Sequence, residues 1–295
     1  MVSDPLTLMA IHAHPDDEAT STGGVLHKYA SEGVRTVLVT CTGGELGDGP
    51  QGLKPGQPGH DPEAVRRVRR AELESACRDL GIWRLEMLGY RDSGMVEWGM
   101  ADAPGSFAGS PLDDEVGRVA KLIERYRPQV VITYGEDGGY GHPDHIRTHQ
   151  VARGAFLSTG IPRKLYYTAF PKSLARRVLA QMKEAGINPW ELGEIDFDPE
   201  NPPFGVDDAL ITTVIDVTAD VPAKLAAVRA HGSQMDNAFF GGLPDQVAPM
   251  VMGAEHFIRA VDLSGATLPE VDLFAGLRQI GASVSDPRPT GEAAY

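Results

Sequence analysis

The sequence predicts an α/β protein with a Rossmann-like, mostly parallel sheet, helices on both faces and a smaller C-terminal lobe. Three observations predict it. Short apolar or β-branched segments alternate with longer segments of helical spacing over residues 1–170. Gly- and Pro-rich stretches separate these segments. A chain of 295 residues with 42% apolar residues is long enough to build such a core and a pocket.

Alternating strands and helices account for this first part of the chain. We expect strands at 6–12, 36–40, 85–88, 130–134 and 165–168. We expect helices at 18–32, 63–80, 112–126 and 143–157. The Gly- and Pro-rich segment 43–62 is a loop long enough to border a site. Helices that connect successive strands are typical of a parallel sheet.

The pattern loosens after residue 171. We expect, in order, a helix to about residue 185, a Pro-rich acidic connector at 188–203, a strand at 210–217, a helix at 221–231 and an irregular tail. We therefore divide the chain into a Rossmann-like catalytic domain, 1–170, and a smaller C-terminal lobe, 171–295, that completes the pocket.

The amino-acid composition limits the classes of partner that the protein can bind. A formal net charge of −14 argues against nucleic acid and anionic membranes, because phosphate binding needs clustered Lys and Arg. No run of about 18 apolar residues could span a bilayer. The N-terminus shows no secretory signal, and two cysteines, Cys41 and Cys77, do not make a disulfide framework. We expect a cytoplasmic protein that acts on a small molecule, and homo-oligomer formation stays open.

Two segments combine imidazole and carboxylate side chains. They are 12–18, His-Ala-His-Pro-Asp-Asp-Glu, and 138–145, Gly-Gly-Tyr-Gly-His-Pro-Asp-His. Each follows a predicted parallel strand. In open α/β sheets ligands bind outside the carboxyl ends of the strands, so segments far apart in the sequence can meet there. Imidazole and carboxylate are ligand types that suit Zn²⁺.

These residues can build a catalytic zinc site, which needs three protein ligands and one open position. His14 and Asp17 can converge on one ion from a turn that enters a helix, and His145 would complete the set. Asp16 projects from the same turn and is free to act as general base, since zinc lowers the pKa of a bound water to about 7. Zn²⁺ is the expected cofactor, with Fe²⁺ left open.

The second segment offers three further catalytic groups. His142 could donate to the developing oxyanion or protonate the leaving amine, and Tyr140 offers a hydroxyl for the tetrahedral oxygen. Asp144 could orient an imidazole. Together these groups predict an amide hydrolase. His149, four residues after His145, is expected at a solvated helix position.

Other interpretations explain less of the sequence. Asp16, Asp17 and Asp144 could merely cap helix N-termini, but this explains poorly why two such segments stand at matching strand ends. A dinucleotide-binding oxidoreductase needs G-x-G-x-x-G after the first strand, and a serine hydrolase needs G-x-S-x-G; neither is present. A degenerate, non-catalytic carbohydrate-binding module would lack a ligand or the base, and none is missing.

The two segments resemble the LmbE-like, or PIG-L-type, zinc de-N-acetylases. The marks of that family are a strand ending in A-H-P-D-D-E and a later H-P-D-H, which stand here at 13–18 and 142–145. The resemblance implies zinc ligands at His14, Asp17 and His145 and a general base at Asp16. It also implies an amino-sugar substrate that carries an N-acyl group.

Within the family, the resemblance narrows to two branches of the mycothiol pathway. The segments 138–145 and 91–95 resemble the N-acetylglucosaminyl-inositol deacetylase, which implies that Asp92 and Arg69 bind sugar and inositol hydroxyls. Ser21 is also similar to that branch. His231 with the Gln three residues later, and 272–276, resemble the mycothiol S-conjugate amidase, whose substrate is a thiol conjugate. His231 then lies near the pocket or simply caps a helix. A third hypothesis is that the protein deacetylates an amino sugar of a natural product.

Overall fold

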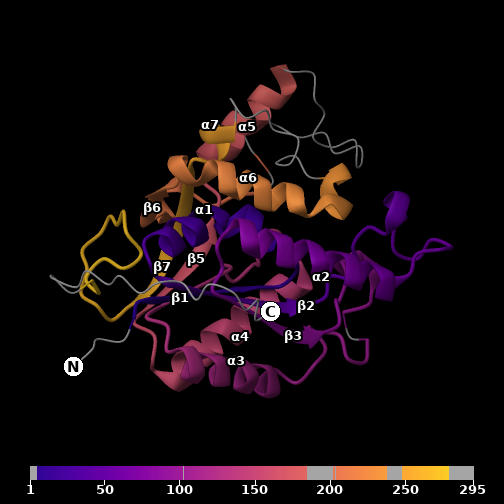
Figure 1. Cartoon of the computed structure of the whole chain (residues 1–295), viewed down its shortest axis with the longest axis horizontal. Helices are drawn as coiled ribbons and strands as arrows, with labels where there is room; N and C mark the ends of the chain where they lie inside the picture. Colours follow the sequence, from indigo (N-terminus) through magenta and orange to yellow (C-terminus); the bar gives the residue numbers. More distant parts are fainter. Residues whose placement is uncertain (1–4, 102, 185–201, 203, 238–247, 279–295) are drawn as a thin grey trace.

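The computed structural model describes residues 5–101, 103–184, 202, 204–237 and 248–278 (Figure 1). Seven strands form one sheet: β1 (Thr7–His12), β2 (Arg35–Thr42), β3 (Arg84–Tyr90), β4 (Val130–Thr133), β5 (Lys164–Ala169), β6 (Thr213–Asp216) and β7 (Ala254–Asp262). Their order across the sheet is β3-β2-β1-β4-β5-β7-β6. The pairs from β3 to β5 are parallel, whereas β7 runs antiparallel to both β5 and β6.

Helices cover both faces of the sheet, as predicted. The α-helices are α1 (Asp17–Ser31), α2 (Pro62–Asp79), α3 (Leu112–Tyr126), α4 (Pro143–Thr159), α5 (Lys172–Glu184), α6 (Val221–Ala230) and α7 (Ala248–Met252). Short 3₁₀ helices are η1 (Pro50–Gly52), η2 (Val96–Trp98), η3 (Asp208–Leu210), η4 (Thr218–Asp220) and η5 (Gly232–Asn237). Among the described residues, no helix is long and apolar enough to cross a membrane.

The alternation of β1 side chains separates two apolar cores. Leu8 and Ala10 pack with residues of α1, α2 and α6, whereas Met9 and Ile11 pack with residues of α3 and α4. Figure 1 shows α3 and α4 on one side of the sheet and α1, α2 and α6 on the other. A central strand buried on both faces is what a near-continuous apolar run predicts.

The expectation of an irregular tail is wrong for Ala254–Asp262. This segment forms β7, which inserts between β5 and β6 and extends the same sheet. The alternation of apolar and polar residues in β7 is hard to recognise in the sequence, because Glu255 and Arg259 interrupt it. In the structure Glu255 forms an ion pair with Lys224, and Arg259 forms one with Glu270. The division at residue 170 stays a prediction, and the connector predicted at 188–203 falls almost entirely outside the described residues.

A buried ion-pair network ties the end of the described chain to the sheet. Lys164 Nζ lies 2.5 Å from Glu270 Oε1, with both side chains fully buried, and Arg259 Nη1 lies 2.9 Å from the same oxygen. Glu270 Oε2 also accepts the hydroxyl of Tyr166 at 2.7 Å. Removing the carboxylate would leave the buried Lys164 without a counter-charge, whereas Arg259 would keep its ion pair with Asp262.

We therefore expect Glu270→Ala to lower the free energy of unfolding by about 3–5 kcal/mol. Urea unfolding followed by circular dichroism measures the change. Glu63→Ala, which removes an exposed ion pair with Arg66, is the control and should cost at most about 1 kcal/mol. Equal effects of the two substitutions would refute the structural role given to the buried network.

Candidate metal centre

The site lies where the strand order reverses. β1 and β4 are neighbours in the centre of the sheet, with β2 and β3 on one side and β5 on the other. The loops that leave β1 and β4 therefore diverge and open a crevice at the carboxyl ends of the strands, the usual ligand position in such sheets. The structure brings the two sequence segments together here, as predicted from their positions after parallel strands.

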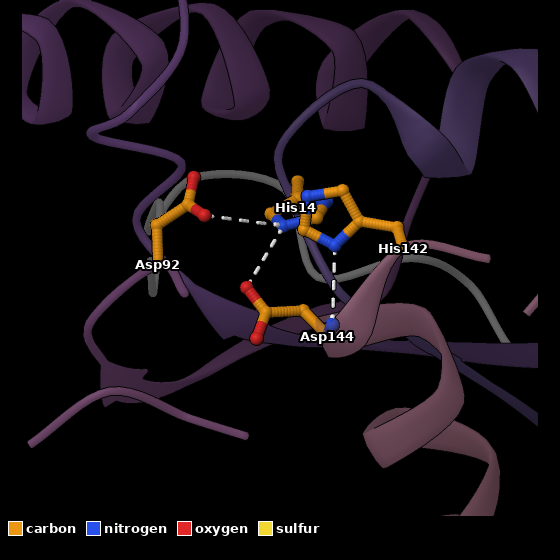
Figure 2. Close-up of side chains that lie close together, drawn as sticks. All are labelled: His14, Asp92, His142 and Asp144. Atoms are coloured by element: carbon orange, nitrogen blue, oxygen red, sulfur yellow. Dashed lines mark hydrogen bonds and ion pairs between the residues drawn. The ribbon is translucent and has the colours of Figure 1, made fainter. Parts of the chain in front are cut away.

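His14 is the central side chain of the site. On one side of its ring, Nε2 lies 3.2 Å from Asp144 Oδ2 and 3.8 Å from Asp92 Oδ1. Figure 2 shows this side, and the ring of His142 makes a T-shaped contact with that of His14, with centroids 4.6 Å apart. The opposite ring nitrogen, Nδ1, faces the other two predicted zinc ligands. The two ring nitrogens of His14 thus face different groups: Nε2 faces Asp144 and Asp92, and Nδ1 faces Asp17 and His145.

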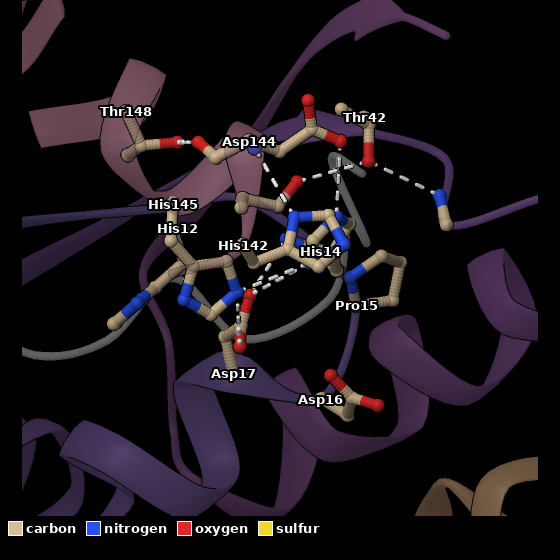
Figure 3. Close-up of polar contacts among 12 residues, drawn as sticks. His12, His14, Pro15, Asp16, Asp17, Thr42, His142, Asp144, His145 and Thr148 are labelled. Atoms are coloured by element: carbon tan, nitrogen blue, oxygen red, sulfur yellow. Dashed lines mark hydrogen bonds and ion pairs between the residues drawn. The ribbon is translucent and has the colours of Figure 1, made fainter. Parts of the chain in front are cut away.

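Two imidazole nitrogens and the Asp17 carboxylate converge on the Nδ1 side (Figure 3). His14 Nδ1 lies 3.3 Å from His145 Nε2 and 3.4 Å from Asp17 Oδ2, and His145 Nε2 lies 3.4 Å from Asp17 Oδ1. A tetrahedral ion with bonds of about 2.0–2.2 Å has ligand-to-ligand edges of roughly 3.3–3.6 Å. One ligand atom from each of the three residues lies within 4.8 Å of the other two, so the three side chains are close enough to share one ion.

The outer nitrogens of both imidazoles are anchored as metal ligands require. His14 Nε2 is within hydrogen-bond distance of Asp144, and His145 Nδ1 is 3.1 Å from the carbonyl oxygen of Gly138. The ring of Tyr134 also stacks on His145, with centroids 4.2 Å apart. Such contacts fix the tautomer and the orientation of a ligating ring.

The electrostatics also favour a cation. Burial would raise the pKa of Asp17, but His145 and His14 hold it well below its usual value. Burial would lower the pKa of His14, yet Asp92, Asp144 and Asp17 raise it well above its usual value. Burial lowers the pKa of His145 to about 4, which leaves this ring neutral and able to ligate. A buried carboxylate cluster of this kind is stabilised by a metal ion.

Asp16 sits at the entry to α1 with an unusual backbone conformation. Its φ is 109°, a left-handed value that is uncommon for a residue other than glycine. Burial raises the pKa of its carboxyl to about 6, although Arg69 acts in the opposite direction. Its side chain is about one third exposed, and Figure 3 shows it set beside the three donors rather than among them.

Arg69, expected to bind substrate, instead holds the Asp16 turn. Its Nη2 donates to Asp16 Oδ2 at 3.0 Å and to the Pro15 carbonyl at 2.5 Å, and its Nη1 donates to the Gly44 carbonyl at 2.6 Å. The residue is only 4% exposed. A Cβ on Gly44 would come within 2.2 Å of Arg69 Nη1, so the 43–47 loop closes tightly over the guanidinium.

The predicted acid–base groups occupy different positions around His14. His142 is buried and caps α4, its Nδ1 accepting the backbone N–H of Asp144 at 3.1 Å. The Asp144 carboxylate reaches His14 and accepts the Ser93 N–H at 2.9 Å. Tyr140 is largely exposed, and its hydroxyl lies 3.4 Å from His145 Nε2.

The three remaining predicted substrate residues lie in three different places. Asp92 is buried beside His14, and its Oδ1 accepts the N–H of Gly94. Ser21 lines a pocket of about 390 Å³ that begins at Asp17, Tyr140 and His145. His231 is only 2% exposed and does not line that pocket; its Nε2 lies 2.7 Å from Glu18 Oε1.

Sequence reasoning missed two supporting residues. Glu18 is fully buried and accepts the Asp16 N–H at 3.0 Å while it contacts His231, so it braces the turn that carries the proposed base. Its place in the A-H-P-D-D-E motif was the available signal. Tyr134 accepts the Ala13 N–H at 2.9 Å and links the ends of β1 and β4. The prediction of a solvated His149 is wrong: it is buried, and its Nδ1 lies 3.0 Å from the Tyr134 carbonyl.

An open α/β sheet whose switch point carries two imidazoles and a carboxylate defines the class of metal-dependent hydrolases. The chain belongs to the PIG-L family, described as GlcNAc-PI de-N-acetylase, whose model matches residues 9–156. The match includes both motif segments and ends within α4. The protein is thus an N-deacetylase of the type that hydrolyses linear amides.

Curated relatives extend the similarity over nearly the whole chain. A 1D-myo-inositol 2-acetamido-2-deoxy-alpha-D-glucopyranoside deacetylase 1 from Saccharopolyspora erythraea is 39% identical, over 96% of this chain and 97% of the relative. A deacetylase of the same description from Acidothermus cellulolyticus is also 39% identical, over 94% and 97%.

Solved structures show the same fold at low sequence identity. The N,N'-diacetylchitobiose deacetylase from Pyrococcus horikoshii superimposes with a TM-score of 0.52 at 20% identity, over 88% of this chain and 85% of that chain. A deacetylase of the teicoplanin biosynthesis pathway gives 0.54 at 22% identity, over 86% and 98%.

Proposed function

We propose that the protein removes the N-acetyl group from N-acetylglucosaminyl-inositol in a zinc-dependent hydrolysis. The observation that carries the proposal is the convergence of His14, Asp17 and His145, whose ligand atoms lie within 4.8 Å of one another. The substrate is taken from the printed names of relatives that are 39% identical over nearly the full chain.

The donor set fits zinc, and the same set of two imidazoles and one carboxylate also binds Fe²⁺. When bound there, zinc would polarise the amide carbonyl and activate a water for attack. Both cysteines are buried free thiols, which suits a reducing compartment, and we place the enzyme in the cytoplasm.

Asp16 is the proposed general base, because it is the motif carboxylate that does not join the metal donors. Arg69 and Glu18 hold it from two directions, through its side chain and its backbone N–H. His142 is the proposed donor to the oxyanion or to the leaving amine. Its Nδ1 accepts the Asp144 N–H, so the neutral ring carries its proton on Nε2.

The remaining residues bind or orient. Asp144 positions the ring of His14, and Tyr140 offers its hydroxyl beside His145. We propose that Asp92 accepts sugar hydroxyls next to the metal centre and that Ser21 contacts substrate in the pocket. His231 acts behind the site through Glu18.

An amine-release assay tests the proposed function. Protein loaded with zinc is given N-acetylglucosaminyl-inositol, free N-acetylglucosamine and a mycothiol S-conjugate side by side, with metal content measured on the same preparation. We expect the inositol glycoside to react fastest. Protein that carries a full equivalent of zinc and releases no amine from any of the three would contradict the proposal.

Arg69→Lys tests the positioning role of this arginine. A lysine is a point charge and cannot hold the three acceptors with the planar geometry of a guanidinium. We expect kcat to fall about 10–100-fold, the usual cost of losing a supporting contact at a metal site, with zinc content and KM little changed. Arg67→Lys, an exposed neighbour on α2, is the control. A rise in KM with unchanged kcat would show instead that Arg69 binds substrate.

A further inference from the structure

The pocket beside the metal centre is much larger than an acetyl group. Its volume is about 390 Å³, whereas a water-sized group such as a methyl occupies roughly 30 Å³. One end is formed by Asp17, Tyr140 and His145, so the pocket opens directly onto the metal donors. A volume in this range is typical of sites that enclose a ligand of many non-hydrogen atoms.

Apolar side chains form most of the pocket wall away from the metal donors. They come from the end of β5, the start of α5, the segment 204–206, α7 and β7: Ala169, Phe170, Leu174, Phe204, Val206, Val251, Met252 and Ile258. These apolar side chains offer no hydrogen-bond partner to a polyhydroxylated ring. The wall suits a flexible hydrocarbon group instead.

Lys224 and Glu255 of the wall are already paired with each other. Lys224 Nζ lies 2.6 Å from Glu255 Oε1, and both side chains are about 95% buried. The Glu255 carboxylate also accepts the N–H groups of Gly24 and Val25 at 2.7 and 2.9 Å. The pair is neutral and internally bonded, so it does not select a charged group.

The half of the amide that enters the pocket follows from the position of Asp92 and from assigning His142 to the leaving amine. His142, the proposed donor to the leaving amine, and Asp92, the proposed hydroxyl acceptor, lie together on the Nε2 side of His14 (Figure 2). Neither lines the pocket, which instead begins on the Asp17 and His145 side. With the sugar nitrogen near His142, the acyl carbon points toward the pocket.

We propose that this pocket binds the acyl group of the substrate, and that the enzyme hydrolyses N-acyl amino sugars with apolar acyl chains longer than acetyl in preference to the acetyl compound. The inference rests on the proposed function, because it assumes amide hydrolysis at the His14, Asp17 and His145 centre. Each methylene buried in the pocket contributes up to about 0.8 kcal/mol, or roughly fourfold in kcat/KM.

A chain-length series tests the proposal. Zinc-loaded protein is assayed with the acetyl, butanoyl, hexanoyl and octanoyl amides of glucosaminyl-inositol, and amine release is measured. We expect kcat/KM for the hexanoyl amide to exceed that for the acetyl amide at least about tenfold. Hydrolysis of the acetyl amide with a steady fall along the series would overturn this inference and leave the proposed function intact. No hydrolysis of any amide would overturn both.

Variants of the wall locate the effect. Ala169→Phe fills the pocket at the end of β5 and should lower the hexanoyl-to-acetyl ratio of kcat/KM at least about tenfold. Leu174→Ala enlarges the pocket and should shift the preferred acyl chain toward octanoyl. This second variant gives a test even if Ala169→Phe folds poorly. Ala209→Phe adds the same ring at an exposed position outside the pocket and should leave the ratio unchanged. A ratio that is equally insensitive to all three changes would refute the assignment.

Discussion

Replacing His14 with alanine should remove both the metal and the activity. His14 supplies one of three converging donors, and its ring also joins the metal centre to Asp144 and Asp92. Zinc polarisation of a carbonyl stabilises the transition state by several kcal/mol, so turnover should fall by roughly 10³-fold or more. Metal analysis after dialysis and amine release, measured on one preparation, give both quantities.

A second histidine provides the control for this substitution. His27 lies on α1, away from the metal centre. His27→Ala removes its partly exposed imidazole, which pairs with Asp220. It should keep its zinc and its turnover. If His14→Ala retained a full equivalent of zinc, the ligand assignment would be wrong.

Asp16→Asn should separate metal binding from turnover. The amide keeps the shape of the side chain and still accepts the Arg69 donor, but it cannot take a proton from the attacking water. We expect zinc content to be unchanged and kcat to fall about 10²–10⁴-fold, the usual contribution of general base catalysis. The contrast with His14→Ala distinguishes a base from a ligand.

The control for Asp16 lies on the helix that braces it. Asp79→Asn changes an exposed carboxylate at the end of α2, the helix that carries Arg69, and should leave kcat unchanged. Full activity of Asp16→Asn would assign the base role to another residue. Loss of zinc from the same variant would make Asp16 a ligand.

The parallel half of the fold could be predicted because its central strands, β1, β2 and β4, are buried on both faces. β1 and β4 have completely buried residues, so their sequences are short apolar runs bounded by glycine or polar residues. β7 could not be recognised in the same way. Its Glu255 and Arg259 look like surface residues in the sequence, and only their ion pairs with residues from other elements explain their burial.

That the two motifs meet could be predicted from sequence because both follow parallel strands that prove to be neighbours. Arg69 was different. It stands in a basic run on α2, and its burial depends on the 43–47 loop, whose course no local pattern indicates. The position of His231 likewise depends on Glu18, a contact across 213 residues. Long-range contacts of this kind are not encoded in local spacing.

The most direct measurement of the central claim is zinc-edge anomalous diffraction from crystals of the zinc-loaded protein. The account predicts one strong peak bonded to His14 Nδ1, His145 Nε2 and an Asp17 oxygen, in the crevice between the ends of β1 and β4. A peak held instead by Asp92, His142 and Asp144, or full zinc binding away from this crevice, would contradict it.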